Sequence, residues 1–135
     1  MVLRGDVYWV DLDKVFQRLY DGRKDHYMRG IRPCAIISNN FNNRNNSIVT
    51  IMPFTTSCDD LPQHRYLPIN GITNYTVPEC ITSIDKSLLK DKYGVINDKY
   101  YNQIEKAIDI QLGLYGNRHN CKGGKIRWQY YTLLS

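Results

Sequence analysis

Two neighbouring apolar segments constrain the fold of this chain more than any other feature. Residues 30–40 have the sequence GIRPCAIISNN, and residues 48–57 have the sequence IVTIMPFTTS. Each segment is rich in β-branched residues and is bounded by residues that favour turns, which is typical of a β-strand. Neither alternates strictly between apolar and polar residues, so both strands are expected to be largely buried. We interpret them as antiparallel neighbours joined by the polar link 40–47.

Antiparallel pairing would bring a cation and hydroxyl groups together at one end of the sheet. Arg32 opens the first strand, and Thr55 and Thr56 close the second. A guanidinium group and a hydroxyl group on a basic protein can form a phosphate-binding site. The chemistry alone is explained more simply by a solvated or acid-paired Arg32 and by threonines that begin a turn.

Composition and charge favour one packed domain with a polyanionic partner. The chain has 135 residues, 42% hydrophobic and 23% charged, which suits a single domain with a core. Its net charge is +5, and the excess of Lys and Arg lies in residues 14–32 and 116–135. Basic segments of this kind favour nucleic acid, although a solvated basic face would have the same composition.

Cysteine spacing and apolar run length exclude several classes of protein. No two cysteines form a C-x-x-C pair and no histidine lies at ligand spacing, so neither a metal nor another cofactor is expected. No apolar run is long enough to span a bilayer, and the N-terminus lacks a signal pattern. We therefore expect a cytoplasmic protein with free thiols and no membrane segment. The cysteines are Cys34, Cys58, Cys80 and Cys121.

The first half of the chain is predicted to contain one further strand and two connections. Residues 5–12 alternate as a half-buried strand does. Residues 13–30 form a long polar connection, and a connection of this length is usually functional or mobile. Residues 40–47 are mostly asparagine and are predicted to form a plain hairpin turn.

The second half is predicted to alternate strands with turns and to end in a helix. Residues 63–69 and Val77–Ile84 are the expected strands, and the dipeptide 70–71 is a turn signal. Asp85 is expected to cap a short helical turn. Apolar residues at three- and four-residue spacing then predict a helix from Asn97 to Gly116.

Four motifs, taken in order, resemble the MazF/PemK family of toxin endoribonucleases. They are RGDVYWVDL at 4–12, GIRP at 30–33 followed by IISN at 36–39, PFTTS at 53–57, and IDKSLL at 84–89. The resemblance covers roughly residues 3–115.

The resemblance implies a mainly β architecture. The expected fold is a small SH3-like barrel of the CcdB/PemK type with a C-terminal α-helix, in a toxin domain of residues 1–116. Residues 117–135 would be a basic and aromatic extension. It could stack on RNA bases, or it could pack on the domain as an added edge strand or a docked tail, and we favour the packed arrangement. The family further implies a homodimer with RNA across the dimer groove. It also implies a cognate antitoxin that neutralises the toxin, in a complex that binds DNA.

The family chemistry is sequence-selective cleavage of single-stranded mRNA without a metal. The 2′-hydroxyl attacks the phosphorus, and the products carry a 2′,3′-cyclic phosphate and a 5′-hydroxyl. The resemblance implies that Arg32 binds the scissile phosphate and stabilises its developing charge, while Thr55 donates a hydrogen bond to it. The candidate RNA-positioning residues are Thr56, Ser57, Asn39, Lys24 and Arg29.

This sequence departs from the family pattern at two places, and two alternatives stay open. The 13–30 connection lacks the common Ser-Glu-Gln-Gly stretch, and Cys80 and Thr82 stand where Gln and Arg are frequent. One alternative is a toxin of the same fold that binds a protein such as DNA gyrase and does not need Arg32 and Thr55. The other is a non-catalytic RNA-binding barrel, which would bind RNA in a salt-dependent manner without cutting it.

Overall fold

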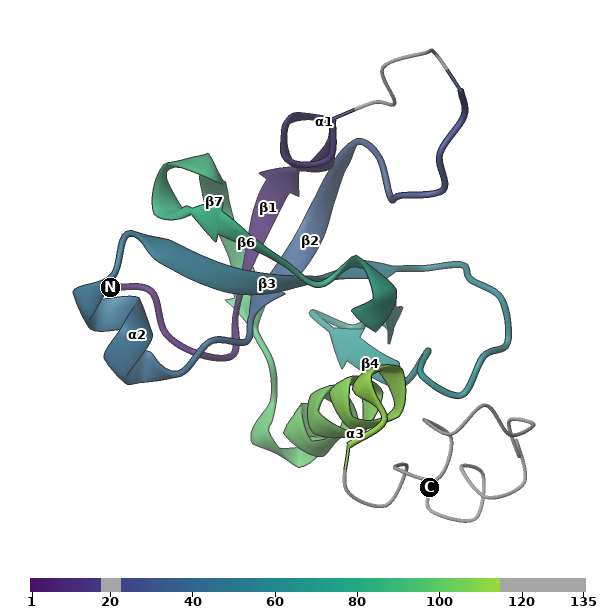
Figure 1. The fold of residues 1–135 in the computed structure, drawn as a ribbon. Coiled ribbons are helices and arrows are strands. Elements are labelled where there is room, and N and C mark those ends of the chain that lie inside the picture. Colours follow the sequence, from purple (N-terminus) through teal and green to yellow (C-terminus); the bar gives the residue numbers. More distant parts are fainter. Residues whose placement is uncertain (18–22, 115–135) are drawn as a thin grey trace.

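The described part of the chain is organised around one curled antiparallel sheet of seven strands (Figure 1). The computed structural model describes residues 1–17 and 23–114, so the extension 117–135 lies outside the described residues. The strand order is β4-β5-β3-β2-β1-β7, with β6 paired to β3. The strands are β1 (Asp6–Asp11), β2 (Ile31–Ile36), β3 (Ile48–Thr55), β4 (Tyr66–Ile69), β5 (Ile72–Thr76), β6 (Thr82–Asp85) and β7 (Leu89–Val95).

Three α-helices and three 3-10 turns complete the described chain. The helices are α1 (Leu12–Val15), α2 (Asn40–Asn45) and α3 (Tyr101–Leu112). The turns are η1 (Pro78–Cys80), η2 (Lys86–Leu88) and η3 (Asp98–Tyr100). The predicted barrel-like sheet with a C-terminal helix is confirmed. No helix among the described residues is long and apolar enough to cross a membrane.

The two faces of the sheet carry separate apolar clusters. On one face, Val7, Ala35 and Met52 pack with Ile104 and Ala107 of α3. The other face holds a cluster of Val10, Leu12, Cys34, Ile36, Val49, Ile51 and Ile84. Since successive side chains of a strand point to opposite faces, Ala35 of β2 belongs to the first cluster, and its neighbours Cys34 and Ile36 belong to the second.

The β4–β5 hairpin closes the sheet against β7. Asn70 and Gly71 both have positive φ, 52° and 76°, as expected for a tight hairpin turn. The Asn70 side chain reaches across the sheet, and its Nδ2 donates to the Tyr93 carbonyl oxygen at 2.7 Å. We call this contact between Asn70 and β7 the latch. A Cβ added at Gly94 would lie 2.9 Å from Asn70 Oδ1, so a larger residue at this position would push the Asn70 side chain out of its present place.

The asparagine-rich segment 40–47 is a helix and not the predicted turn. The Asn39 side chain accepts a hydrogen bond from the Asn42 backbone N–H at 2.8 Å and so begins α2. Asn43 is buried, and its Nδ2 donates to the Ser38 carbonyl at 2.8 Å. The prediction was wrong because asparagine side chains that bond to nearby backbone groups favour helix caps as well as left-handed turns.

The predicted strand Val77–Ile84 was also wrong. Pro78 begins the 3-10 turn η1, and the strand β6 starts only at Thr82. Two strands, β5 and β7, were not predicted. β5 is short and polar, while β7 is an edge strand whose exposed charges obscure any apolar pattern.

Several predicted boundaries shift by a few residues. The helix predicted from Asn97 to Gly116 begins with η3, which Asn97 caps, and α3 ends at Leu112. Gly113 stops it, in the left-handed conformation at φ 65°. The strand predicted at 63–69 begins at Tyr66, and the connection predicted as 13–30 starts with the short helix α1. The helical turn capped by Asp85 is confirmed as η2.

Candidate active site

Arg32 and Thr55 lie across from each other at one end of the β2–β3 ladder. The register of these two strands pairs Cys34 with Pro53 and Ala35 with Met52. Continuing it outward by two residues on each strand places Arg32 opposite Thr55. Both residues line one cavity of about 210 Å³. The juxtaposition expected from the sequence is therefore present, and the catalytic role of the pair stays a prediction.

The Arg32 guanidinium is exposed and is anchored from one side. Its Nε donates to the Arg29 carbonyl oxygen at 2.9 Å, which fixes the plane of the group. In the described part of the chain no carboxylate forms an ion pair with Arg32. Within the described residues, pairing with an acid therefore does not explain Arg32. The guanidinium is positioned to receive an external anion.

The Thr55 hydroxyl is held by the turn that follows β3. Its Oγ1 donates to the Ser57 carbonyl at 2.8 Å and accepts from the Ser57 backbone N–H at 3.2 Å. Thr56 is exposed and lines the same cavity as Arg32. Ser57 lines a neighbouring hollow of about 360 Å³, whose wall also includes Asp59 and Asp60.

A half-buried histidine fixes the loop after Thr55. His64 Nδ1 lies 2.7 Å from the Asp59 carbonyl oxygen, and His64 Nε2 lies 2.7 Å from Glu79 Oε2. Because a carbonyl oxygen can only accept, Nδ1 carries the hydrogen of that bond. His64 thus ties residues 56–64 to η1, and no sequence spacing indicated this contact.

The two basic candidates of the 13–30 connection have different surroundings. The Arg29 guanidinium donates to the Phe16 carbonyl oxygen and to the carboxylate of Asp25. Arg29 therefore has a structural role in the connection, while its carbonyl anchors Arg32. Lys24 is exposed on the same segment. Neither side chain lines the Arg32 cavity, and their contact with RNA stays a prediction.

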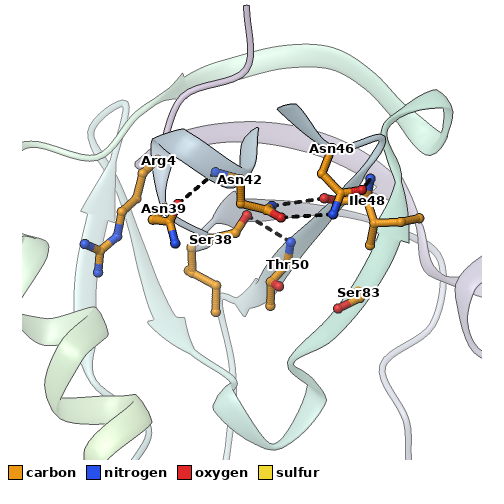
Figure 2. A pocket seen from close by; sticks show the side chains of 9 residues that line it. Arg4, Ser38, Asn39, Asn42, Asn46, Ile48, Thr50 and Ser83 are labelled. Carbon is orange, nitrogen blue, oxygen red and sulfur yellow. Dashed lines mark hydrogen bonds between the residues drawn. The ribbon is translucent and has the colours of Figure 1, made fainter. Parts of the chain in front are cut away.

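Asn39 lies apart from the other predicted site residues. It lines a polar cavity of about 630 Å³ beside α2, at the opposite end of β3 from Thr55 (Figures 1 and 2). Figure 2 shows Asn39, Asn42 and Asn46 around this cavity, with hydrogen bonds to one another and to Ile48. Its role as the cap of α2 accounts for Asn39 without a ligand.

Four further residues around Arg32 were missed by the sequence interpretation. Trp9 and Tyr93 meet edge to face, with ring centroids 4.8 Å apart. Ile72 and Asn74 line the same cavity from β5. Trp9 lies in one of the family-like motifs, but the other three lie on the two unpredicted strands. No group of metal-ligating side chains suited to a metal ion occurs among the described residues.

The family model for the PemK-like, MazF-like toxin of type II toxin–antitoxin systems matches residues 3–112. The chain belongs to this family. It is 31% identical over 121 residues to the endoribonuclease MazF of Staphylococcus saprophyticus, covering 85% of this chain and 94% of that protein. It is 27% identical over 126 residues to the endoribonuclease MazF of Staphylococcus epidermidis, covering 89% and 98% of the two chains.

Solved structures of PemK/MazF toxins have the same fold. An endoribonuclease from a mycobacterial species, solved in complex with its cognate antitoxin, superimposes with a TM-score of 0.68 at 29% identity. This match covers 85% of the present chain and 98% of that one. MazF from Deinococcus radiodurans has a TM-score of 0.64 at 17% identity, covering 83% and 96%, and this likeness bears on the fold alone.

Proposed function

We propose that this protein cleaves single-stranded RNA at the Arg32–Thr55 end of its sheet, as the toxin of a toxin–antitoxin pair. The observation that carries the proposal is the position of Arg32 and Thr55, which lie on neighbouring strands just beyond the last paired residues of the β2–β3 ladder and line one cavity. The chain that carries them belongs to the PemK/MazF toxin family. Its curated relatives are named endoribonucleases, which supports the same class of activity here.

The proposed reaction is an intramolecular transesterification that needs no metal. The 2′-hydroxyl loses its proton and its oxygen attacks the adjacent phosphorus, the bond from phosphorus to the 5′ oxygen breaks, and the 5′ oxygen takes up a proton. The products are a 2′,3′-cyclic phosphate and a 5′-hydroxyl. Arg32 stabilises the added negative charge on the phosphate oxygens, because a guanidinium always carries its charge and presents paired donors. Thr55 supplies a second donor by turning its hydroxyl hydrogen from Ser57 toward the phosphate.

Further side chains are proposed to position the RNA, and two protein partners are proposed as well. Thr56 and Ser57 extend the hydroxyl-rich edge beside Thr55, and Lys24 contributes positive charge from the connection. The partners proposed are a cognate antitoxin and a second copy of this chain, in the cytoplasm. The mycobacterial neighbour solved with its cognate antitoxin supports the antitoxin partner.

The deciding experiment is cleavage of a long single-stranded RNA in EDTA by the wild type, Arg32→Ala and Arg44→Ala. Arg44 is a matched control, because it is an equally exposed arginine on α2 at the other end of the sheet. We expect discrete fragments with 5′-hydroxyl ends from the wild type and Arg44→Ala. Arg32→Ala should lose about 10²–10³-fold in rate, as is common for one aimed donor.

Two results would contradict this proposal. Absence of cleavage by folded wild-type protein across varied RNAs would leave a protein-binding toxin or a non-catalytic RNA-binding barrel. Full activity of Arg32→Ala would support the ribonuclease activity but would show that Arg32 is not part of the catalytic site.

A further inference from the structure

The cavity beside Arg32 has the size and lining of a base-binding pocket. Its volume of about 210 Å³ is below the ~300–1,000 Å³ of pockets for drug-sized ligands, so it suits one ring system. Trp9 and Tyr93 supply aromatic surface, while Ile31 and Ile72 are about half exposed, at 54% and 49%. Apolar and aromatic walls of this kind stack on nucleobases.

The cavity contains one buried polar side chain, Asn74, which is 3% exposed. Its Nδ2 donates one hydrogen bond to the Ile72 carbonyl at 3.1 Å. A side-chain amide has two N–H donors and an acceptor oxygen, so further hydrogen-bonding capacity remains for a ligand. Asn74 pairs with the buried Leu67 across β4 and β5, which places it on the inner face of the sheet. A buried amide in an apolar wall can discriminate the polar edge of a base.

The pleat of the strands places the apolar lining of this pocket and the proposed phosphate-binding groups on opposite faces of the sheet. Ile31 and Pro33 alternate with Arg32 along β2, so their side chains leave the strand on the opposite face. The same alternation separates Phe54 from Thr55 on β3. Both faces border the cavity at the strand ends. If Arg32 held a phosphate, the neighbouring base could therefore pass the end of β2 and enter the pocket on the other face.

The charges of the lining residues make this pocket a better place for a nucleotide than the neighbouring hollow of about 360 Å³ that Ser57 lines. No carboxylate is among the residues that line the Arg32 cavity, whereas Asp59 and Asp60 line the neighbouring hollow. RNA brings a phosphate with every base, and phosphate next to a carboxylate is unfavourable. The neutral pocket beside the cation is the more favourable place for the nucleotide that is cut.

Building on the proposed ribonuclease function, we propose that this cavity binds the base of a nucleotide adjoining the scissile phosphate. Trp9 and Tyr93 stack on the base, and Asn74 selects it by hydrogen bonding. Asn74 is thus a specificity-determining residue for one position of the cut site, and it leaves the chemistry of Arg32 and Thr55 unchanged.

The first test maps cut sites in a random-sequence RNA pool in EDTA by sequencing the 5′-hydroxyl ends. Asn74→Leu keeps the size of the side chain and removes its hydrogen bonds. It should abolish the base preference at one position next to the cut and preserve the preferences elsewhere. Ile72→Trp fills the cavity from an exposed position and should lower kcat/KM by about 10–100-fold, the usual effect of losing one stacked base. Ile48→Trp is the matched control, because Ile48 is 42% exposed on β3 and lies away from the cavity.

The second test measures base binding without cleavage. The chain has two tryptophans, so Trp128→Phe leaves Trp9 as the only one. Trp9 fluorescence is titrated with short single-stranded oligodeoxynucleotides, one for each base type, which lack the attacking 2′-hydroxyl. One base type should quench Trp9 at a lower concentration than the other three, and adding Asn74→Leu should remove that difference.

The outcomes separate this proposal from the proposed function. If the wild type cuts and Arg32→Ala does not, but folded Asn74→Leu and Ile72→Trp keep wild-type cut sites and rates, the base pocket is wrong and the nuclease assignment stands. If Asn74→Leu does not fold, the kcat/KM of Ile72→Trp is compared with that of Ile48→Trp, and equal values would overturn the base pocket. If the wild type does not cut RNA, the nuclease assignment fails, and a Trp9 response that is absent or equal for all four bases overturns the pocket as well.

Discussion

At the scale of single residues, the site depends on backbone carbonyls as much as on side chains. Arg32 takes its orientation from the carbonyl of Arg29, and Thr55 takes its orientation from the carbonyl of Ser57. Both anchors lie in connections and not in strands. The two proposed catalytic side chains are therefore held by local turns at the ends of the sheet, which would combine precise placement with access to a long ligand.

The cysteines illustrate how environment controls reactivity at this scale. Cys58 is exposed, but partial burial raises the pKa of its thiol, and the carboxylates of Glu79, Asp59 and Asp60 raise it further. Burial also raises the pKa of Cys34 and of Cys80. A raised pKa leaves less of the reactive thiolate at a given pH.

We predict that iodoacetamide labels Cys58 before Cys34 and Cys80 in the folded protein, and more slowly than it labels Cys58 in urea-unfolded protein. Raising the pH should accelerate the Cys58 reaction, because more of its thiol then ionises. Peptide mass spectrometry over a time course measures each site separately. Labelling of Cys34 at the same rate as Cys58 in folded protein would contradict the prediction.

At the scale of elements, α3 stabilises the fold through a narrow apolar stripe. Ile104 and Ala107 are fully buried against the inner face of the sheet, whereas Leu112, at the end of the same helix, is 59% exposed. Hydrophobic spacing identified the helix but could not show which residues of the stripe are covered.

Ile104→Ala should lower the free energy of unfolding by roughly 2–5 kcal/mol, because it removes buried methyl groups and leaves a cavity. Leu112→Ala should change it by less than about 0.5 kcal/mol. Urea denaturation followed by circular dichroism compares the two variants. Equal losses would show that the C-terminal end of α3 is covered in solution.

Elements whose structure is determined by their own residues could be predicted from the sequence, and elements that depend on distant neighbours could not. The strands β2 and β3 carry their own apolar runs, so their pairing and the meeting of Arg32 with Thr55 could be predicted. β5 and β7 are stabilised by neighbours far away in sequence, so they were missed, and Asn74 and Tyr93 were missed with them. The asparagines of α2 were misassigned because the same side chain caps helices and makes turns.

At the scale of the whole molecule, the latch connects the β4–β5 hairpin to β7, an edge strand of the same sheet. The Asn70 side chain donates to the Tyr93 carbonyl and occupies the space that a side chain at position 94 would need. Residues from β5 and β7 line the Arg32 cavity together, so the latch connects two of its walls.

We predict that Gly94→Ala destabilises the protein by about 1–3 kcal/mol, the usual range for overpacking. The same substitution should cost less in an Asn70→Gly background, since glycine keeps the positive φ at position 70 and removes the obstructing side chain. Thermal denaturation of the four proteins forms a double-mutant cycle. Strictly additive losses would show that Asn70 and Gly94 do not interact.

The latch has an evolutionary consequence. A toxin gains new targets when its recognition changes while its chemistry stays intact, and here the two functions depend on different parts of the chain. Lengthening or shortening the Asn70–Gly71 turn would move one wall of the pocket relative to the other without altering β2 or β3. If the proposed base pocket is correct, changes in the length of this hairpin would alter which RNA sequences are cut and leave Arg32 and Thr55 in place.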